Sequence, residues 1–216
     1  MDVLDLDWSA SGILASASID NRVLIWDLGF QHTSSAQSMG NGKGSFIPSI
    51  VSPVRVLTGH QSFVRGISFD PLMKYLATCG ADNTLILWDT ESWKESHRTT
   101  EPLKDASDRA LFTRLSWAPD GASLCITSSF KSAKPISAVL KRDSWQSVAD
   151  LVGHRVETMS CRFLPCIVNH TSASSAKQSS SSDGDSLTGA TDGQSQSKAI
   201  PSCFVAVGDL EVRELL

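Results

Sequence analysis

The sequence predicts an all-β protein built from repeated antiparallel sheets. Short runs of alternating apolar residues, each bounded by turn-forming residues, are typical of half-buried strands. One such run ends in an aromatic residue and occurs four times, at Trp8, Phe69, Trp117 and Phe163, with spacings of 61, 48 and 46 residues. No helical period accompanies it. We therefore expect a unit of about 40 residues plus insertions, a period typical of repeat architectures.

Each repeat continues in the same order. A turn follows the aromatic residue, with proline in three of the four copies, because proline ends a strand and starts a bend. Second strands are expected at ILASAS (13–18), YLATCG (75–80), SLCITS (123–128) and CFVAVG (203–208). Third strands are expected at RVLIWD (22–27), TLILWD (84–89) and ISAVLK (136–141). Asp-Asn pairs at 20–21 and 82–83 supply the tight turns between the second and third strands of the first two copies.

The second copy, LTGHQSFVRGISFDPLMKYLATCGADNTLILWD (57–89), has Gly-His at its front and Trp-Asp at its back. This pattern resembles the WD repeat of β-propellers. The resemblance implies a hydrogen-bonded tetrad inside one blade, formed by His60, Thr78, Asp82 and Trp88. The first copy keeps a partial set, Ser16, Asp20 and Trp26. A buried polar network is tolerated when it is complete, and losing one member leaves the others unsatisfied at roughly 1–3 kcal/mol each.

The remaining copies depart from this pattern. The third has Ser-Asp at 107–108 in place of Gly-His, Lys134 in place of the turn Asp, and Leu140 in place of Trp. We therefore expect apolar packing alone to hold that blade. The first copy has no Gly-His, and the fourth is interrupted and has no Trp-Asp. Propellers need roughly four to eight blades to close, so about three and a half blades indicate a fragment of a seven-bladed propeller.

The predicted organisation has five parts. They are an incomplete blade (1–28), a flexible loop (29–53), a blade with an intact tetrad (54–95), a degenerate blade (96–148) and a truncated blade (149–216). A Ser-rich insertion at 169–202 interrupts the last blade and is expected to be disordered, because it cannot bury enough apolar surface. We favour a passive surface insertion, and a phosphorylatable regulatory loop is the alternative.

Composition argues against several classes of function and location. A net charge of −4 and a pI of about 5.7 disfavour direct nucleic-acid binding. No apolar run approaches the roughly 18 residues of a membrane span, and the acidic N-terminus does not resemble a signal peptide. Five cysteines at irregular spacings, mostly in apolar contexts, indicate reduced thiols in an intracellular protein.

Catalytic constellations are not evident. We find no nucleophile with a base, no convergent carboxylates and no phosphate-binding loop. We therefore expect no enzyme activity, no catalytic residue, no cofactor or metal, and no small-molecule substrate. A zinc site is disfavoured because the spacing of its possible ligands departs from structural zinc patterns. Those ligands would be Cys161, Cys166, His154 and His170.

Two further features have a structural and a functional interpretation. Basic residues at 131, 134 and 141–142 fit a solvated strand edge better than a nucleic-acid site. Trp93 and Trp145 have no place in a tetrad, and each follows a third strand by about five residues. Packing under an outer strand is the favoured interpretation. The alternative is an anchor for a partner, because tryptophan is enriched at binding hot spots.

The run 59–166 resembles the WD domain of HIRA-type histone chaperones. The stretches that carry the resemblance are GHQSFVRGISFDPLMKYLAT, DNTLILWDTESWKESHRTTEPL, RLSWAPDGASL and KRDSWQSVADLVGHR. Shared features are Trp93 after Trp88, a degenerate third blade ending in Arg142 and Trp145, and VGHR at 152–155. A Ser-rich insertion before an AVG strand at 206–208 also fits, whereas DLEVRE at 209–214 departs from the family pattern.

This resemblance implies a nuclear chromatin-assembly subunit that acts independently of DNA replication and modulates or represses transcription. Its propeller would be a docking platform for the other subunits of a histone-deposition complex, with histones reached through that complex and no membrane partner. The alternative is a WD adaptor of another class. This could be a ubiquitin-ligase substrate receptor, or the WD subunit of the replication-coupled chromatin assembly factor.

Overall fold

The computed structural model describes residues 2–27, 52–106 and 110–166, together with the backbone of strands at 168–170, 200–202 and 205–209. The elements are β1 (Val3–Trp8), β2 (Ile13–Ser18), β3 (Arg22–Asp27), β4 (Arg55–Thr58), β5 (Val64–Phe69), β6 (Tyr75–Gly80), β7 (Leu85–Asp89), β8 (Glu95–Thr99), the 3-10 helix η1 (Glu101–Leu103), β9 (Ser116–Trp117), β10 (Ser123–Lys131), β11 (Lys134–Lys141), β12 (Ser147–Val152), β13 (Thr158–Phe163), β14 (Val168–His170), β15 (Ile200–Ser202) and β16 (Val205–Asp209).

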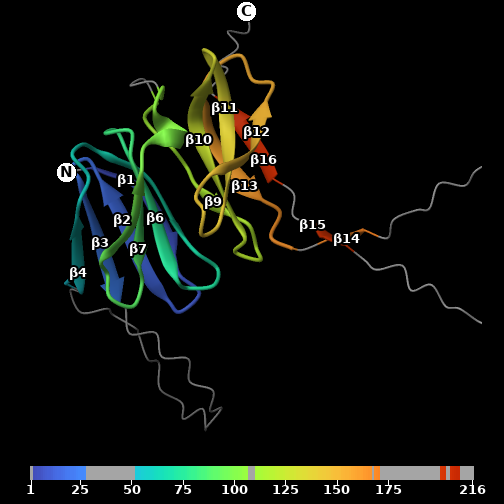
Figure 1. The fold of residues 1–216 in the computed structure, drawn as a ribbon. Coiled ribbons are helices and arrows are strands. Elements are labelled where there is room, and N and C mark those ends of the chain that lie inside the picture. Colours follow the sequence, from blue (N-terminus) through green and yellow to red (C-terminus); the bar gives the residue numbers. More distant parts are fainter. Residues whose placement is uncertain are drawn as a thin grey trace, which may run out of the picture.

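Three four-stranded antiparallel sheets stand side by side (Figure 1). We name them blade A (β1–β4), blade B (β5–β8) and blade C (β9–β12), and we name the pair β13–β16 blade D. Within blades A to C the strands follow chain order, so the first strand forms the inner edge and the fourth the outer edge. This arrangement confirms the prediction of an all-β, partial WD propeller.

The sheets are offset by one strand from the predicted sequence units. β4 pairs with β3, in the register Val23↔Leu57, although it falls inside the predicted unit 54–95. β8 likewise pairs with β7, with Leu87 opposite His97, although most of it falls in the unit 96–148. The predicted boundaries therefore cut each sheet before its outer strand. The physical reason is that the segment ahead of each Gly-His closes the preceding sheet.

The tight turns form where the Asp-Asn pairs predict them. Asn21 and Asn83 have φ angles of 68° and 57°. Asparagine tolerates this left-handed conformation better than most residues. In blade C the hairpin turns instead at Ser132 and Ala133, with φ angles of 51° and 61°. Two successive left-handed residues make a two-residue hairpin loop, and β10 and β11 extend beyond the predicted strands to reach it.

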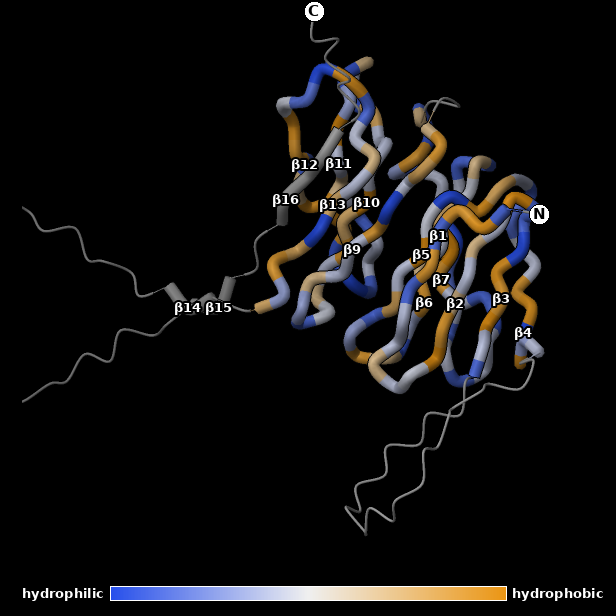
Figure 2. The backbone as a smooth tube through the Cα atoms, turned by 180° about the vertical axis from the view of Figure 1, so that it is seen from behind, coloured by the Kyte–Doolittle hydropathy of each residue, from blue (hydrophilic) through white to orange (hydrophobic). Residues whose placement is uncertain are grey.

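Apolar cores lie between the blades rather than within them. Small and branched residues of blade A face the larger side chains of blade B, and the same pairing recurs between B and C. The A–B core includes Ala15, Ala17, Val23, Ile25, Ile67, Phe69, Leu76, Ile86 and Trp88. Figure 2 shows the hydrophobic colour concentrated along the strands and the hydrophilic colour at many of the turns. Each blade is therefore stabilised by its neighbours, as expected for a repeat array.

The first strand of blade A exposes side chains that are buried at the equivalent positions of the other blades. Leu6 and Trp8 are 56% and 50% exposed, whereas the equivalent Phe69 and Trp117 are 6% and 7% exposed. No blade among the described residues packs on this face of blade A. The inner strand of blade C is also shorter than predicted. The reason is that Thr113 and Arg114 donate their N–H groups to Arg65 and Met159 of the neighbouring blades instead of to β10.

Short strands lie at the ends of the predicted Ser-rich insertion. β14 pairs with β15, with Asn169 opposite Pro201. The rest of that insertion, at 171–199, and most of the predicted loop at 29–53 fall outside the described residues. Among the residues that are described, no helix has the length and apolar character needed to cross a membrane.

Candidate functional site

The structure brings the four tetrad residues together in blade B. Thr78 on β6 lies opposite Ile86 of β7 and next to Trp88, while His60 and Asp82 come from the turns that follow β4 and β6. The Trp88 indole N–H donates to Thr78 Oγ1 at 3.0 Å. His60 Nε2 lies 2.8 Å from the same hydroxyl, and His60 Nδ1 lies 3.1 Å from Asp82 Oδ1. The four side chains therefore form one chain of hydrogen bonds.

Thr78 Oγ1 accepts the indole N–H and lies 2.8 Å from His60 Nε2 and 3.4 Å from the Ile86 carbonyl. The Asp82 carboxylate can only accept, so it favours the His60 tautomer that carries its proton on Nδ1 and donates it to Asp82. In that tautomer, Nε2 accepts from the Thr78 hydroxyl. The indole N–H is therefore held by the Thr78 hydroxyl, and His60 is linked to the indole through that hydroxyl. Every member has a partner, which is the condition for burying such a network.

Asp82 is the acceptor at the end of this chain. Gln61 N donates to its Oδ2 at 2.6 Å, and the Thr84 hydroxyl donates to its Oδ1 at 2.7 Å. Partial burial alone would raise the pKa of Asp82, but the hydrogen bonds from His60, Thr84 and Gln61 outweigh it and hold the pKa well below its ordinary value. Sequence reasoning missed Thr84. The signal was a hydroxyl residue two positions after the turn Asp.

In blade A, only two of the three predicted tetrad residues contact each other. Trp26 Nε1 donates to Ser16 Oγ at 2.9 Å, as the indole of blade B does to its threonine. Asp20 instead caps its own turn by accepting the N–H of Arg22 at 3.2 Å. The structure therefore joins two of the three predicted residues and leaves the third in a local turn role.

Blade C has apolar residues where blade B has its tetrad. Leu140 lies opposite Leu124 as Trp88 lies opposite Leu76, and Ile126 takes the place of Thr78. Both Leu140 and Ile126 are fully buried. The prediction that apolar packing alone holds this blade is nevertheless wrong, because two polar links tie blade C to its neighbours.

The first link is an ion pair to blade B. Arg142 Nη2 lies 2.5 Å from Oδ2 of Asp70, a carboxylate with no exposed surface, and Arg142 also donates to the Gly121 carbonyl at 2.8 Å. The guanidinium lies 5.1 Å from the ring centre of Tyr75 and 5.5 Å from that of Trp117. A carboxylate can be buried here because it is paired and hydrogen-bonded.

The second link joins blade C to blade D. Thr158 of β13 places its hydroxyl 2.9 Å from that of Ser137, and its carbonyl accepts the Ser128 hydroxyl at 2.8 Å. All three residues are buried. These hydrogen bonds give blade C a buried polar link to blade D.

The two extra tryptophans occupy matching turns. Trp93 and Trp145 both have left-handed φ angles, 56° and 52°, and each donates its N–H to the carbonyl four residues earlier. Trp145 is only 8% exposed and packs edge-on against Tyr75 and Trp117. Its burial contradicts the partner-anchor hypothesis for Trp145 and supports core packing. Trp93 is half-buried against the A–B core, and its role in partner binding stays a prediction.

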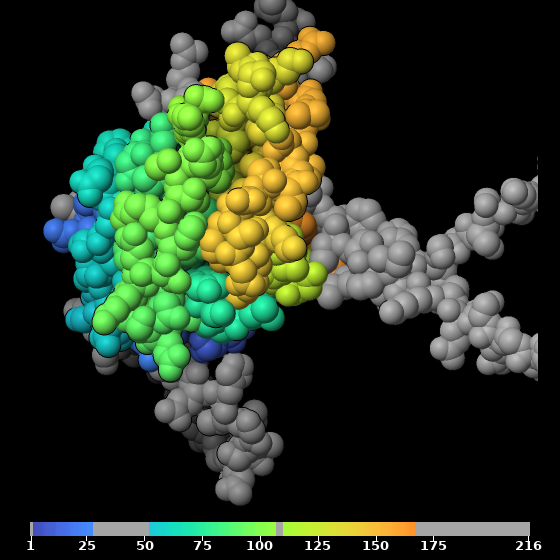
Figure 3. All heavy atoms as spheres, viewed as in Figure 1, coloured from blue at the N-terminus to red at the C-terminus, as the bar shows by residue number. Residues whose placement is uncertain are grey.

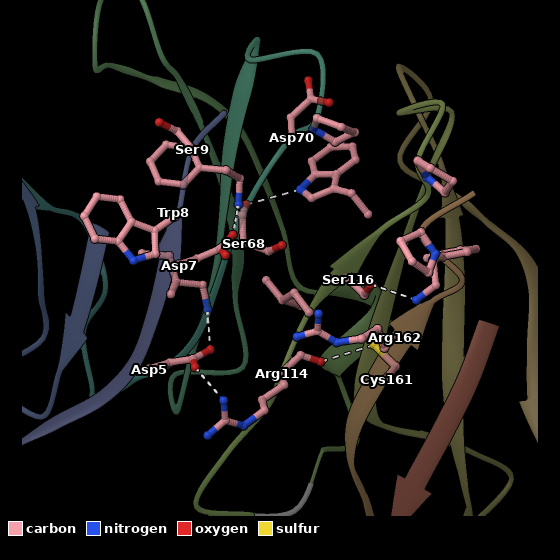
Figure 4. Close-up of a pocket in the computed structure, with 18 of the residues that line it drawn as sticks. Asp5, Asp7, Trp8, Ser9, Ser68, Asp70, Arg114, Ser116, Cys161 and Arg162 are labelled. Atoms are coloured by element: carbon pink, nitrogen blue, oxygen red, sulfur yellow. Dashed lines mark hydrogen bonds and ion pairs between the residues drawn. The ribbon is translucent and has the colours of Figure 1, made fainter. Parts of the chain in front are cut away.

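A pocket of about 590 Å³ opens where the inner strands of all four blades meet (Figure 4). Carboxylates come from blade A, at Asp5 and Asp7, and guanidinium groups come from blades C and D, at Arg114 and Arg162. Ser68 and Ser116 contribute hydroxyls from the strands between them. This pocket brings charged side chains of three blades to one concave site.

The carboxylates of this pocket are engaged in holding the blades. Asp5 accepts the N–H of Ile67 at 3.1 Å, and Asp7 accepts the N–H of Phe69 at 2.6 Å. Burial raises the pKa of both carboxyl groups above the ordinary value, although these N–H bonds oppose it. The N–H groups lie on the free edge of β5. Their capture protects that edge from pairing with another chain.

Arg162 differs from these groups because it is exposed. It extends from β13 into the pocket and faces the side that carries Asp7, whose charge it stabilises (Figure 4). An exposed guanidinium in a concave site can bind a carboxylate or carbonyl oxygen of a partner. The pocket is therefore suited to protein recognition.

The surroundings of Cys161 and of the basic cluster indicate structural roles. Cys161 is buried, with Sγ 3.3 Å from the Arg114 carbonyl, and a hydrogen bond with Cys125 together with burial raises its pKa. Among the described residues, no group of three or more His, Cys, Asp or Glu side chains could hold a metal ion. Lys131 pairs with Asp150 at 2.5 Å, so part of the basic cluster is already neutralised.

Comparison with known proteins supports these assignments. The family described as "WD domain, G-beta repeat" matches residues 1–27 and 51–89. The chain is 32% identical to Protein HIR1 of Mycosarcoma maydis over 167 residues, which is 77% of this chain and 14% of that protein. It is 33% identical to Protein HIR1 of Cryptococcus neoformans over 166 residues, 76% of this chain and 16% of the relative.

A relative from an animal gives the same result. Protein HIRA of Caenorhabditis elegans is 32% identical over 169 residues, covering 78% of this chain and 16% of the worm protein. The chain thus spans less than a fifth of the length of these curated relatives. WD repeats, sheets that pack as propeller blades and this similarity over three quarters of its length place the chain among the HIRA-type WD-repeat proteins.

Proposed function

We propose that this protein is a non-enzymatic scaffold of a nuclear histone-deposition complex. Its activity would be replication-independent nucleosome assembly and the modulation or repression of transcription. It would bind other subunits of the complex and reach histones through them. The observation that carries the proposal is the similarity to proteins named HIR1 and HIRA across three quarters of the chain.

The interactions of the buried carboxylates and thiols support a scaffold function. Asp5, Asp7 and Asp70 are occupied by bonds between blades. The thiols of Cys79 and Cys161 have raised pKa values, for which burial is the main cause at Cys79. A raised thiol pKa disfavours the thiolate that nucleophilic chemistry requires. The described residues thus offer surfaces for binding and no evident catalytic pair.

Charge supports protein partners over nucleic acid. The net charge is −4, and two residues of the basic cluster between positions 131 and 142 form ion pairs, Lys131 with Asp150 and Arg142 with Asp70. Nucleic-acid affinity depends on cations that are free to neutralise phosphates. Contact with chromatin would therefore run through protein subunits.

Affinity purification from nuclear extract tests the proposal. The tagged chain is expected to bring down core histones and the subunits of a replication-independent deposition complex, identified by blotting and mass spectrometry. Gly66→Val is the matched control, because a Cβ at that position would lie 1.8 Å from the Thr113 carbonyl oxygen and prevent blades B and C from packing. Recovery of ubiquitin-ligase subunits, or of the replication-coupled assembly factor, would instead establish the alternative adaptor role.

A further inference from the structure

The outer strand of blade C is apolar where the outer strand of blade B is polar. The two blades lie side by side on the face shown in Figure 3, in green and in yellow to orange. Leu140 of β11 occupies the position of Trp88 in β7, so the pairings of the two outer strands can be aligned. In this alignment Ser-His-Arg-Thr-Thr at 96–100 corresponds to Val-Ala-Asp-Leu-Val at 148–152.

The two valines of this run are exposed. Val148 is 60% exposed and Val152 is 71% exposed, the largest fraction among the exposed large hydrophobic side chains of the described residues. Val148 is the extra residue of a β-bulge, and from Ala149 to Val152 the pairing with β11 is regular. An apolar and regular stretch of strand therefore faces solvent.

β12 is also the outer edge of its sheet. Among the described strands it pairs with β11 alone, so every second N–H and C=O of its backbone points outward without a strand partner. Exposed edges are often protected by charged side chains. The edge of blade B carries the ion pair of Arg98 with Glu95, whereas the one charged residue of β12, Asp150, pairs with Lys131 of β10. The edge of β12 is therefore open to the addition of a strand.

Cations lie at one end of this edge. Lys134 begins β11 two residues before Ile136, which lies opposite Val152, and Arg155 follows Val152 by three residues. Both basic residues are exposed, and neither forms an ion pair with another described residue. This end of the edge therefore favours an acidic group on whatever binds beside it.

We propose that the outer edge of β12 binds an extended segment of a partner protein, which adds to blade C as a further antiparallel strand. Backbone hydrogen bonds to β12 would supply affinity, and β-branched side chains of the segment would pack beside Val148 and Val152. An acidic residue at the N-terminal end of the segment would face Lys134 and Arg155. This inference rests on the proposed scaffold function and names one site through which a partner docks.

Peptide titration tests the strand addition. The probe is acetyl-Glu-Val-Thr-Val-Thr-Val-amide, added to the isotope-labelled chain while backbone amide signals are followed by NMR, and shifts are expected at β11 and β12. Two matched peptides carry N-methyl groups on the valines or on the threonines. Because alternate residues of a strand bond to the same neighbour, one of these peptides should lose binding and the other should keep it. An equal effect of the two modifications, or shifts outside blade C, would overturn the proposal.

Substitutions separate the apolar and the charge contributions. Val148→Ser combined with Val152→Thr gives β12 the residues of the equivalent strand of blade B, and it should weaken binding by about fivefold. Leu111→Ser is the control, because Leu111 is 67% exposed and lies outside this edge, and it should leave affinity unchanged. Lys134→Glu combined with Arg155→Glu should weaken binding by about threefold for each charge reversed. The same variant should favour a matched peptide that begins with lysine.

All five substituted residues are exposed, so circular dichroism should show the fold of each variant unchanged. Undiminished binding to the double valine variant would contradict the proposal. Concentration-dependent dimerisation of the chain, measured by sedimentation and lost in that variant, would assign the edge to a second copy and overturn the partner segment.

The peptide assay contains no histones, so its result is independent of the histone-deposition role. Edge binding without histone recovery would argue against that role alone. Histone recovery without edge binding would argue against the edge alone.

Discussion

Arg114 of blade C donates from Nη1 to Oδ1 of Asp5 in blade A at 2.9 Å, linking two residues 109 positions apart. The inner strand of blade B lies between them, and it has a glycine, Gly66, at the level of this pair. The Arg114 side chain is 49% exposed. A pair this accessible contributes at most about 1 kcal/mol. The close backbone approach that accompanies it is therefore the more important contact.

Gly66→Ala is expected to destabilise the protein strongly. A Cβ at this position would lie 1.8 Å from the Thr113 carbonyl oxygen, so blade C must move away from blade B. Overpacking of this kind costs about 1–3 kcal/mol or more. Chemical denaturation would measure the loss in the free energy of unfolding. Ser96→Ala, on an exposed part of β8, is the control, and an equal effect from both variants would contradict the role of Gly66.

Thr78→Val tests the tetrad. The valine leaves the Trp88 indole N–H and His60 Nε2 without their shared partner in a buried site. The expected loss is roughly 1–3 kcal/mol in the free energy of unfolding.

Ser16→Ala in blade A is the matched variant. It removes the acceptor of Trp26, but this indole is only half-buried, so water can replace part of the lost bond. The loss should be smaller, roughly 0.5–1.5 kcal/mol. A larger effect at Ser16 than at Thr78 would show that the complete network adds nothing to blade B.

Arg142→Met tests the clamp between blades B and C. It leaves the Asp70 carboxylate buried without its cation, for which about 3–5 kcal/mol is typical. The double variant Asp70→Asn with Arg142→Met should lose less than the sum of the single variants, because it removes the unpaired charge. Additive effects in this double-mutant cycle would show that the two side chains do not interact.

The sequence predicts contacts within a repeat better than contacts between repeats. Thr78, Asp82 and Trp88 lie within eleven residues, so their spacing along two paired strands is enough to place them together. Arg142 and Asp70 are 72 residues apart, and their pairing depends on how blade C packs on blade B. The Trp-Asp pattern therefore predicts the tetrad, whereas the ion pair between Arg142 and Asp70 is found only in the structure.

The pH dependence of stability should have opposite signs at Asp82 and Asp5. Hydrogen bonds lower the pKa of Asp82 below 3.8, so its contribution is complete above pH 3.8 and is lost as the pH falls toward the lowered value. Burial raises the pKa of Asp5 above 3.8, so its charged form destabilises the fold, and acidification through the raised pKa relieves that penalty.

Unfolding free energies of the wild type, Asp82→Asn and Asp5→Asn would be compared between about pH 3 and pH 6, the range in which unpaired carboxyl groups begin to titrate. On lowering the pH, the wild type should lose its advantage over Asp82→Asn and should gain relative to Asp5→Asn. If the stability differences between the wild type and each of the two variants changed with pH in the same direction, the opposite environments of these two carboxylates would be contradicted.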